Sequence, residues 1–454
     1  MTNISVDDWR LPAVVAPDAD YPVLAEVDVL VVGAGAAGVA AATVAAEAGK
    51  SVLLVEKYGF AGGAAVAGMS GTVCGLYLAN GAGSSPEQVV WGFTERFRHG
   101  LAERGGLTPP QRYGRTWTSA HDPLVWRETA DALLAAAGVR VLFHTSVVGV
   151  VMDGDAYRGA VLSSNAGTCV VHAARTIDAS GDAALVARAG GRHTFGDAGR
   201  IQNPTMFFRL GGVDVDAFLS GYGEDTISPP WVSERIRQAR ELGADLPRDK
   251  IWIFTTPRPG ELMVNATRLT GADGRMLNVI DPADFTDAEI RGRRQVREYA
   301  RFIARDLPGC QDAYVVDTGV EAGVRQTRTI TGAATLTNDA VVSGRKDPSG
   351  IARSPWPIEL HDGERPKLHW LDDDYYEVPY LTLVPEAGEN VIVAGRCLSA
   401  QHEALASARV TAQCFEYGHA AAVATVLSLD EGTPYRRVEG ARVRSTMRQN
   451  GSAL

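Results

Sequence analysis

The chain has 454 residues, which is too long for one typical domain and favours two interleaved domains. Hydrophobic residues make up 45% and charged residues 22%, and the net charge of −10 with no basic run does not indicate nucleic-acid binding. No Cys-x-x-Cys pair, metal-ligand cluster, signal peptide or bilayer-spanning apolar stretch is present in the sequence. These features predict a cytoplasmic protein with no metal site and no nucleic-acid or membrane partner.

Residues 28–57 read as a strand, a glycine-rich turn, an alanine-rich helix and a second strand. Gly33, Gly35 and Gly38 form G-x-G-x-x-G directly after the first strand, where they allow a tight turn and close approach of the backbone to a pyrophosphate. Glu56 ends the second strand 21 residues after Gly35, close to the ~20 at which an acid meets the ribose hydroxyls of a dinucleotide. A glycine turn in an ordinary α/β unit would explain the glycines but not the acid, so we expect dinucleotide binding.

Further signals extend this unit along the first half of the chain. Gly62 and Gly63 indicate that backbone passes close to a bulky cofactor, with a flexible loop as the alternative. Helices are predicted from an N-cap at Ser85 to about residue 104 and, after Asp122, to about residue 137. Short alternating strands then predict an antiparallel meander that returns beside the first strand. These strands cover residues 139–143, 145–151, 157–163, 168–173 and 176–182.

The composition changes between about residues 190 and 375, where the α/β rhythm is lost and tryptophan, proline and arginine increase. We expect a second domain there, with a helix at about 286–305 and a mixed sheet. The strands of this sheet are predicted at 204–210, 251–255 and 261–266. A strand at 390–394 and a long helix at about 404–428 then return to the first domain. The predicted divisions are an N-terminal arm (1–26), a nucleotide-binding domain (27–190 and 376–454) and a substrate-binding domain (191–375).

Four segments together resemble the FAD-dependent oxidoreductases of the glutathione reductase structural class, and the resemblance covers most of the chain. They are VVGAGAAG at 31–38 with Glu56 and the glycine pair, TIDASGDAALVARAG at 176–190, GVRQTRTITG at 323–332 and ENVIVAGRCLSAQHEALASARV at 389–410. Ser180 stands where the family usually has threonine. The resemblance implies an α/β fold, in which an FAD-binding Rossmann-like domain with a parallel sheet and an antiparallel meander is interleaved with an α+β substrate domain.

The resemblance also implies a noncovalently bound FAD. The glycine turn would hold the pyrophosphate, Glu56 the adenosine ribose and the backbone of Val147 the adenine. Gly395 and Arg396 would lie at the ribityl chain, and a helix starting near Ser407 would stabilise negative charge on the flavin. The complete set of implied cofactor residues is Gly33, Gly35, Ala36, Ala37, Gly38, Glu56, Lys57, Gly62, Gly63, Ala64, Val147, Ala179, Ser180, Gly181, Gly395, Arg396 and Ser407.

The chain contains no second G-x-G-x-x-G after a strand, which argues against a dedicated NAD(P) domain. The second electron partner is then an external acceptor or donor, such as oxygen, a carrier protein or a transiently bound nicotinamide. The sequence does not indicate an oligomeric state.

Four residues are candidates for catalysis. Arg325 and Arg328 are three apart, so on a helix they would share a face and clamp a carboxylate; a surface ion pair is the alternative. By the resemblance His402 would lie near the isoalloxazine as a general acid or base, unless it only caps a helix or fills the core. His361 falls where the family often has a histidine after an apolar strand, with a surface position as the alternative.

The residues and the resemblance together predict an FAD-dependent oxidoreductase. It would transfer a hydride between flavin and a small organic substrate, for which the arginines favour an anion. One alternative is a flavin monooxygenase that uses NAD(P)H and oxygen. Another is a binding protein that keeps the fold without redox chemistry, although the intact glycines and Glu56 argue against it.

Overall fold

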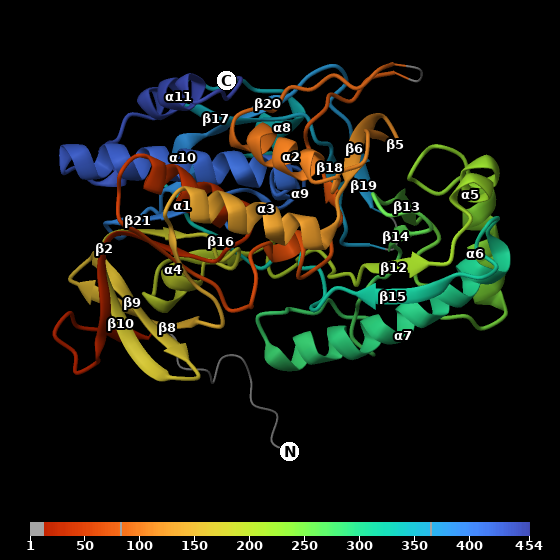
Figure 1. The fold of residues 1–454 in the computed structure, drawn as a ribbon, viewed down its shortest axis with the longest axis horizontal. Helices are drawn as coiled ribbons and strands as arrows, with labels where there is room; N and C mark the ends of the chain where they lie inside the picture. The colour runs from red at the N-terminus through yellow and green to blue at the C-terminus, as the bar shows by residue number, and fades with distance from the viewer. Residues whose placement is uncertain (1–12, 82–83, 364–365) are drawn as a thin grey trace.

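The computed structural model describes residues 13–81, 84–363 and 366–454. Its larger sheet is built around β10 (Gly167–Asp178), which pairs in parallel with β2 (Val23–Val32). On its other edge β10 pairs antiparallel with β9 (Ala156–Ser164) over its first half and parallel with β21 (Val391–Val393) at its end. The strand order is β1-β8-β9-β10-β2-β3-β7, with β21 branching from β10 (Figure 1). The predicted α/β fold with an antiparallel meander is confirmed.

The centre of this sheet is apolar on both faces, because each face packs against other parts of the chain in a hydrophobic core. The last four residues of β2 and all four of β3 (Val52–Val55) are buried. Helices α1 (Ala36–Glu47) and α10 (Thr411–Glu431) pack against each other on one side. Gly418 allows this contact, since a Cβ there would lie 2.0 Å from the carbonyl oxygen of Ala37. The C-terminal part of the chain thereby covers the N-terminal glycine turn and helix.

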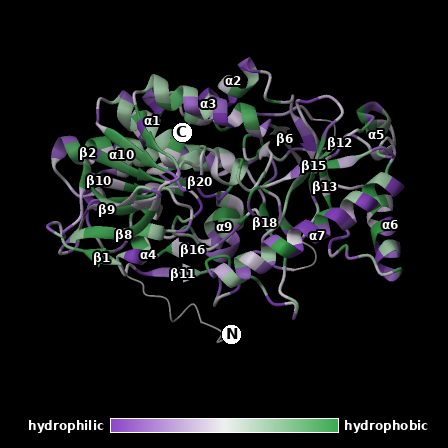
Figure 2. Cartoon of the chain, turned by 60° about the horizontal axis from the view of Figure 1, so that its bottom comes forward, coloured by the Kyte–Doolittle hydropathy of each residue, from purple (hydrophilic) through white to green (hydrophobic). Residues whose placement is uncertain are grey.

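A second sheet has the order β13-β14-β12-β15. All its pairings are antiparallel, so the prediction of a mixed sheet is wrong. Helix α7 (Pro282–Asp306) packs on it through Val296, Tyr299 and Phe302, which share a hydrophobic core with Phe208 of β12. Figure 2 shows hydrophilic and hydrophobic residues alternating along α7, as expected of a helix with one buried face. The strands are β12 (Phe208–Gly211), β13 (Trp252–Thr255), β14 (Leu262–Asn265) and β15 (Tyr314–Thr318).

Two predicted helices differ from those observed. Helix α2 begins at Phe93, not at Ser85, because Gln88 is extended and bridges Tyr77 in an antiparallel pairing. The single helix expected near the C-terminus is two helices, α9 (His402–Ala408) and α10, because Val410 has an extended backbone with ψ of 165°. The predicted helix after Asp122 is confirmed as α3, and the Asp122 carboxylate accepts hydrogen bonds from the first turn.

The remaining elements connect or border the two sheets. The other strands are β1 (Val14–Val15), β4 (Thr72–Val73), β5 (Gln111–Tyr113), β6 (Thr116–Ala120), β7 (Arg140–Leu142), β8 (Ser146–Asp153), β11 (His193–Phe195), β16 (Arg328–Ile330), β17 (Gly350–Ser354), β18 (Ile358–Leu360), β19 (Lys367–His369) and β20 (Tyr376–Pro379). The other helices are α2 (Phe93–Glu103), α3 (Pro123–Ala136), α4 (Ala184–Arg188), α5 (Val215–Tyr222), α6 (Pro230–Glu241), α8 (Asn338–Val342) and α11 (Gly440–Gln449). The proposed domain boundaries stay a prediction.

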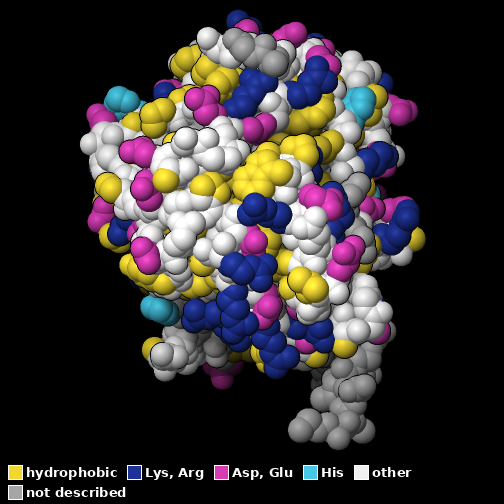
Figure 3. All heavy atoms as spheres, turned by 90° about the vertical axis from the view of Figure 1, so that its right-hand side faces the viewer, with side chains coloured by type: hydrophobic (Ala, Val, Ile, Leu, Met, Phe, Trp, Pro, Cys, Tyr) yellow, Lys and Arg dark blue, Asp and Glu magenta, His cyan; other side chains and the backbone are white. Residues whose placement is uncertain are grey.

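Charged side chains of both signs are interspersed on the end of the molecule formed by α5, α6 and α7 (Figure 3). On α7, Arg291 pairs with Asp287 and Arg301 with Glu298 across one turn of the helix. Such exposed pairs contribute little to stability because water screens them. None of the helices in the described part of the chain is long and apolar enough to cross a membrane.

The close contact between Gly38 and Gly33 gives a first prediction. A Cβ at Gly38 would lie 1.8 Å from the carbonyl oxygen of Gly33, so Gly38→Ala forces the helix away from the strand. We expect a loss of about 3 kcal/mol in the free energy of unfolding, measured by urea denaturation of the flavin-free protein. Gly35→Ala is the matched control, because its Cβ has only the Cα of Gly63 nearby, at 3.8 Å. Equal stability of the two variants would contradict this prediction.

Candidate functional site

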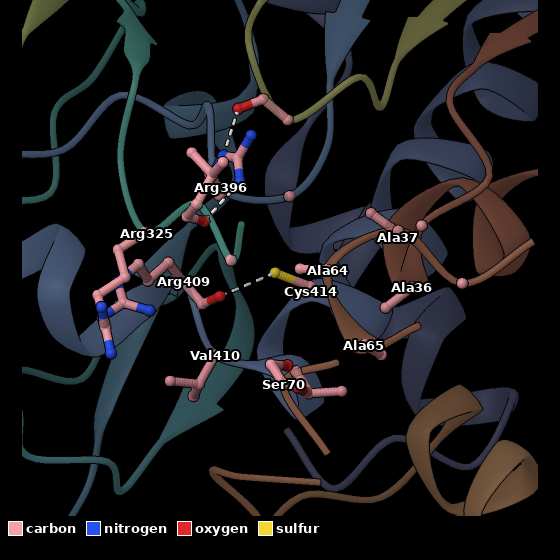
Figure 4. Close-up of a pocket in the computed structure, with 18 of the residues that line it drawn as sticks. Ala36, Ala37, Ala64, Ala65, Ser70, Arg325, Arg396, Arg409, Val410 and Cys414 are labelled. Atoms are coloured by element: carbon pink, nitrogen blue, oxygen red, sulfur yellow. Dashed lines mark hydrogen bonds between the residues drawn. The ribbon is translucent and has the colours of Figure 1, made fainter. Parts of the chain in front are cut away.

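A cavity lies where the carboxyl ends of β2 and β10 face the small antiparallel sheet. It holds about 1640 Å³ of space free of protein atoms, part of which opens to solvent. Its wall combines the glycine turn, the ends of β13 and β14, and the start of α10. In Figure 4, Ala36 and Ala37 lie on one side of the cavity and Arg325 and Arg409 on the other. The position matches the edge at which open α/β sheets bind ligands.

The glycine turn is held by backbone contacts and by one carboxylate. Gly33 has a φ of +94°, and a Cβ there would lie 2.6 Å from the carbonyl oxygen of Ala179. The Glu56 carboxylate accepts hydrogen bonds from the backbone N–H of Ala34 at 2.7 Å and of Tyr58 at 3.0 Å. Burial raises the pKa of Glu56 in spite of these bonds. Glu56 therefore supports the turn, and its predicted bond to a ribose stays a prediction.

The residues at this end of the cavity fit a dinucleotide pyrophosphate. Gly35 lines the cavity and has open space where a Cβ would stand. The first N–H groups of α1, at Ala36 and Ala37, have no acceptor within the helix and lie at its positive end. Gly62 and Gly63 also line the cavity, with φ of +151° and +48° that other residues rarely adopt. A backbone cradle for an anion is thus present where FAD would need one.

Arg396 joins three distant segments beside this cradle. Its Nε donates to the carbonyl oxygen of Gly181 at 2.8 Å, its Nη1 to that of Val324 at 2.6 Å and its Nη2 to Asp182 Oδ1 at 2.7 Å. Burial alone would raise the pKa of Asp182, but Arg396 and Thr327 outweigh it and hold this pKa below its usual value. Arg396 therefore holds the cavity wall together, and its place at a ribityl chain stays a prediction.

Most of the predicted site residues line the cavity. They are Gly33, Gly35, Ala36, Ala37, Glu56, Lys57, Gly62, Gly63, Ala64, Ala179, Ser180, Gly181, Arg325, His361, Gly395 and Arg396. Gly38 does not, because it packs against Gly33. Val147 lies on β8 and packs in the core of the large sheet, not in the cavity wall.

The expected helix start near Ser407 is wrong. Ser407 lies in the last turn of α9, where its hydroxyl donates to the carbonyl oxygen of Trp356 and bonds the Tyr376 hydroxyl. The helix start in the cavity wall is instead that of α10, because Val410 and Thr411 line the cavity. If a helix N-terminus stabilises negative charge on the flavin, it is therefore that of α10.

Two catalytic candidates do not line the cavity. Arg328 lies on strand β16, so it shares no helix face with Arg325, and its side chain donates to the carbonyl oxygen of Asp182 at 3.4 Å. The predicted double-arginine clamp is therefore wrong. His402 begins α9 close to Gly196, where a Cβ would lie 3.1 Å from its Nδ1. The structure thus gives His402 no contact with the cavity.

A buried polar cluster occupies the end of the cavity opposite the glycine turn. Tyr113 donates its hydroxyl to Glu359 Oε1 at 2.7 Å, and His361 Nε2 lies 3.5 Å from the same oxygen. Arg248 donates from Nη2 to His361 Nδ1 at 2.9 Å. Burial, followed by the neighbouring arginines, lowers the pKa of His361 well below its usual value, so the imidazole is neutral at neutral pH. Burial raises the pKa of Glu359.

Arg325, which is buried, and Arg409, which is half-buried, bring two cations into the cavity wall. Arg325 donates to the carbonyl oxygen of Asn203 at 2.8 Å, and Arg409 to Gln202 Oε1 at 3.0 Å. Within the described residues, no carboxylate forms an ion pair with either guanidinium. Burial, together with Arg248 and Arg409, lowers the pKa of Arg325 well below its usual value, and the nearby Glu359 carboxylate offsets only part of this shift.

The sequence pointed to Arg325 and His361 but missed Tyr113, Glu359 and Arg409. Glu359 stands two residues before His361 in the strand that the histidine was expected to follow, and this alternation could have indicated it. Tyr113 lies 246 residues away from Glu359 and carries no local signal.

The cavity and the sheet around it define an α/β protein with a site for a dinucleotide between β2 and β10, where the strand order reverses. A family model described as FAD dependent oxidoreductase matches residues 28–447. The chain therefore belongs to the FAD-dependent oxidoreductase family, is an enzyme of that family, and FAD is the cofactor that the family implies. The backbone cradle described above fits this cofactor.

Individual relatives are more distant. A urocanate reductase from Eggerthella lenta is 49% identical over 62 residues, which is 14% of this chain and only 10% of that protein. A geranylgeranyl bacteriochlorophyll reductase-like protein from Thermoplasma acidophilum has 15% identity and a TM-score of 0.51, over 93% of this chain and 83% of that one. The p-nitrophenol 4-monooxygenase PnpA from Pseudomonas putida has 12% identity and a TM-score of 0.45, over 93% and 84%. The Thermoplasma protein confirms the fold, and at this identity it shows the fold alone.

The open space at Gly35 gives a second prediction. Gly35→Val places a branched side chain where the pyrophosphate would lie, so FAD affinity falls by about 10- to 100-fold. The thermal midpoint of the flavin-free protein stays near that of the wild type, because the new side chain meets open space. FAD fluorescence titration and differential scanning calorimetry measure the two effects. A variant that purifies with a full complement of flavin would contradict the proposed position of the pyrophosphate.

Proposed function

We propose that this enzyme transfers a hydride between FAD and a small anionic organic substrate, and that an external acceptor or donor turns the flavin over. The observation that carries the proposal is the pair of guanidinium groups, buried Arg325 and half-buried Arg409, at the end of the cavity away from the glycine turn. A buried cation without a carboxylate partner is costly, and an anionic substrate offsets that cost. We infer that Arg325 and Arg409 bind a substrate carboxylate.

The walls around these arginines support a substrate with an apolar body. Tyr113, Phe254 and Trp356 line the cavity, and the Tyr113 ring centroid lies 5.0 Å from that of Trp356 and 6.3 Å from that of Phe254. Aromatic walls exclude water, and in a drier site a guanidinium binds a carboxylate more strongly. FAD, when bound, supplies hydride transfer at its N5 atom. The N-terminus of α10, at Thr411, would favour negative charge on the cofactor or substrate next to it.

The proposal also includes the structural class of the enzyme and the way in which FAD is attached. Membership of the glutathione reductase structural class in particular, and noncovalent attachment of FAD, both rest on the resemblance of the sequence motifs. The short match to a urocanate reductase agrees with a redox role for this chain but covers too little of either protein to name a substrate.

An absorbance spectrum of the purified protein, followed by anaerobic additions, tests the function. We expect flavin bands near ~375 and ~450 nm that are bleached, or restored after reduction, by members of a panel of small carboxylates. Substrate-stimulated NAD(P)H oxidation with oxygen inserted into the product would identify a monooxygenase instead. A colourless protein that takes up no added FAD would leave only the non-redox binding function.

Arg325 provides a third prediction. Arg325→Ala removes a charge-assisted contact, so the dissociation constant of the probe benzoate rises by about 10- to 100-fold while FAD is retained. Perturbation of the visible flavin spectrum reports benzoate binding. Arg328→Ala is the matched control, since Arg328 is a buried arginine of the same segment that does not line the cavity. Equal benzoate affinity in wild type and Arg325→Ala would show that the substrate-anion site lies elsewhere.

A further inference from the structure

Four side chains contact one another in sequence, starting in the cavity wall at Tyr113 and ending at buried Arg248. Tyr113 at the end of β5 and Glu359 on β18 both line the cavity, and their side chains are joined by the 2.7 Å hydrogen bond. Behind Glu359 stands His361, 3% exposed, and behind His361 stands Arg248, 1% exposed. His361 also lines the cavity, but both of its ring nitrogens face protein groups, so the tyrosine and the carboxylate are the candidates for proton handling.

The bonding pattern assigns the protons among these four side chains. An arginine has only hydrogen-bond donors, so Nδ1 of His361 must be the acceptor of the bond from Arg248. The histidine proton is then on Nε2, which faces Glu359 Oε1. Protonating Nδ1 would place two donors against each other at 2.9 Å. Arg248 thus holds His361 neutral with its Nε2–H facing Glu359 at 3.5 Å, and His361 has no free position for another proton.

Elimination leaves Glu359 as the group in this chain of side chains that can change its protonation. The titratable or charged groups around it are Tyr113, His361, Cys74, Arg248, Arg325 and Arg409. The arginines keep their protons in proteins, and His361 is held neutral. Burial raises the pKa of the Cys74 thiol to about 11, and burial together with Glu359 raises the pKa of Tyr113 well above its usual value. Both therefore stay protonated.

We propose that Glu359 takes up one proton from water when a carboxylate binds beside Arg325 and Arg409, and that Tyr113 passes this proton between Glu359 and the bound substrate. In the first step an O–H bond forms on the Glu359 carboxylate and no group is oxidised or reduced. In the second step the Tyr113 oxygen loses its proton on one side as it gains one on the other, so its own charge does not change. The inference rests on the proposed function, because it requires an anion at the two arginines.

The direction of the effect follows from charge. A second carboxylate in the same buried space disfavours ionised Glu359, because like charges at short range in a medium of low polarity repel strongly. Burial already raises the pKa of Glu359 in the free protein, and the ligand raises it further. Binding and protonation then favour each other, so benzoate binds more tightly as the pH falls.

The test is the pH dependence of benzoate binding to the FAD-loaded full-length protein, between about pH 5.5 and 8.5. The visible flavin spectrum gives the dissociation constant, and a pH-indicator dye in weak buffer gives the number of protons taken up. We expect the dissociation constant to fall by up to about tenfold for each unit of decreasing pH, with close to one proton taken up. In Glu359→Gln, which keeps the shape of the side chain, both the pH dependence and the proton uptake disappear.

Two further variants separate this role from a structural one. Glu321→Gln is the matched control, because Glu321 also lines the cavity but bonds Tyr58 and Lys57, and it should keep the pH dependence of the wild type. His361→Leu removes the polar N–H that faces Glu359, so the pH dependence of benzoate binding persists with its midpoint at higher pH. FAD content of each variant, read from its absorbance, shows that the site is intact.

Each outcome has a defined meaning. Benzoate binding that is independent of pH in the wild type, or that keeps its pH dependence in Glu359→Gln, overturns the role of Glu359. Loss of the dependence in His361→Leu with its retention in Glu359→Gln would transfer the role to His361. Failure of benzoate to bind the wild type at any pH tells against the anion site, and thus against the proposed function itself.

Discussion

The backbone contact between the glycine turn after β2 and the end of β10 is the constraint on which the site depends. At Gly33 and at Gly38 even a methyl group would overlap a carbonyl oxygen, so the strand, the turn and α1 meet without side chains between them. This contact points the free N–H groups at the start of α1 into the cavity. The Glu56 carboxylate stabilises the turn by accepting a hydrogen bond from the N–H of Ala34. The cofactor end of the site is therefore made mainly of backbone.

The opposite end of the cavity follows a different principle. There the structure gathers charge in a buried region, with Arg325 and Arg409 in the wall and the Tyr113–Glu359 pair beside them. Buried charge is held by hydrogen bonds to backbone and amide oxygens, such as that from Arg325 to Asn203. One end of the cavity is thus made by backbone contacts, and the other by long side chains from several segments. The two ends can therefore vary independently among proteins of this fold.

The sequence predicts the features that neighbouring residues encode, and it does not predict the contacts that form between distant segments. The glycine turn, the meander and α3 were predictable because their signals lie within a few residues of one another. Arg328 was misplaced because helical spacing was assumed for a segment that pairs as strand β16 with β11. Arg409 was missed because the break between α9 and α10, at Val410, has no glycine or proline to mark it. The partners of Glu359 come from distant segments, and no local pattern encodes them.

The order of assembly follows from where β21 and α10 lie in the sequence. Residues 391–431 cover a sheet and a helix that are complete by residue 178, so nearly half of the chain is made between them and their cover. During synthesis the side of α1 that packs against α10 has no partner until α10 leaves the ribosome, whereas its other sides pack on β2, β3 and α3. The contact of α10 with α1, whose first turn lines the cavity, is thus a late event that closes a long loop, which slows folding and leaves apolar surface exposed in the nascent chain. We expect such a chain to depend on chaperones, or on early capture of its cofactor, more than its ordinary composition suggests.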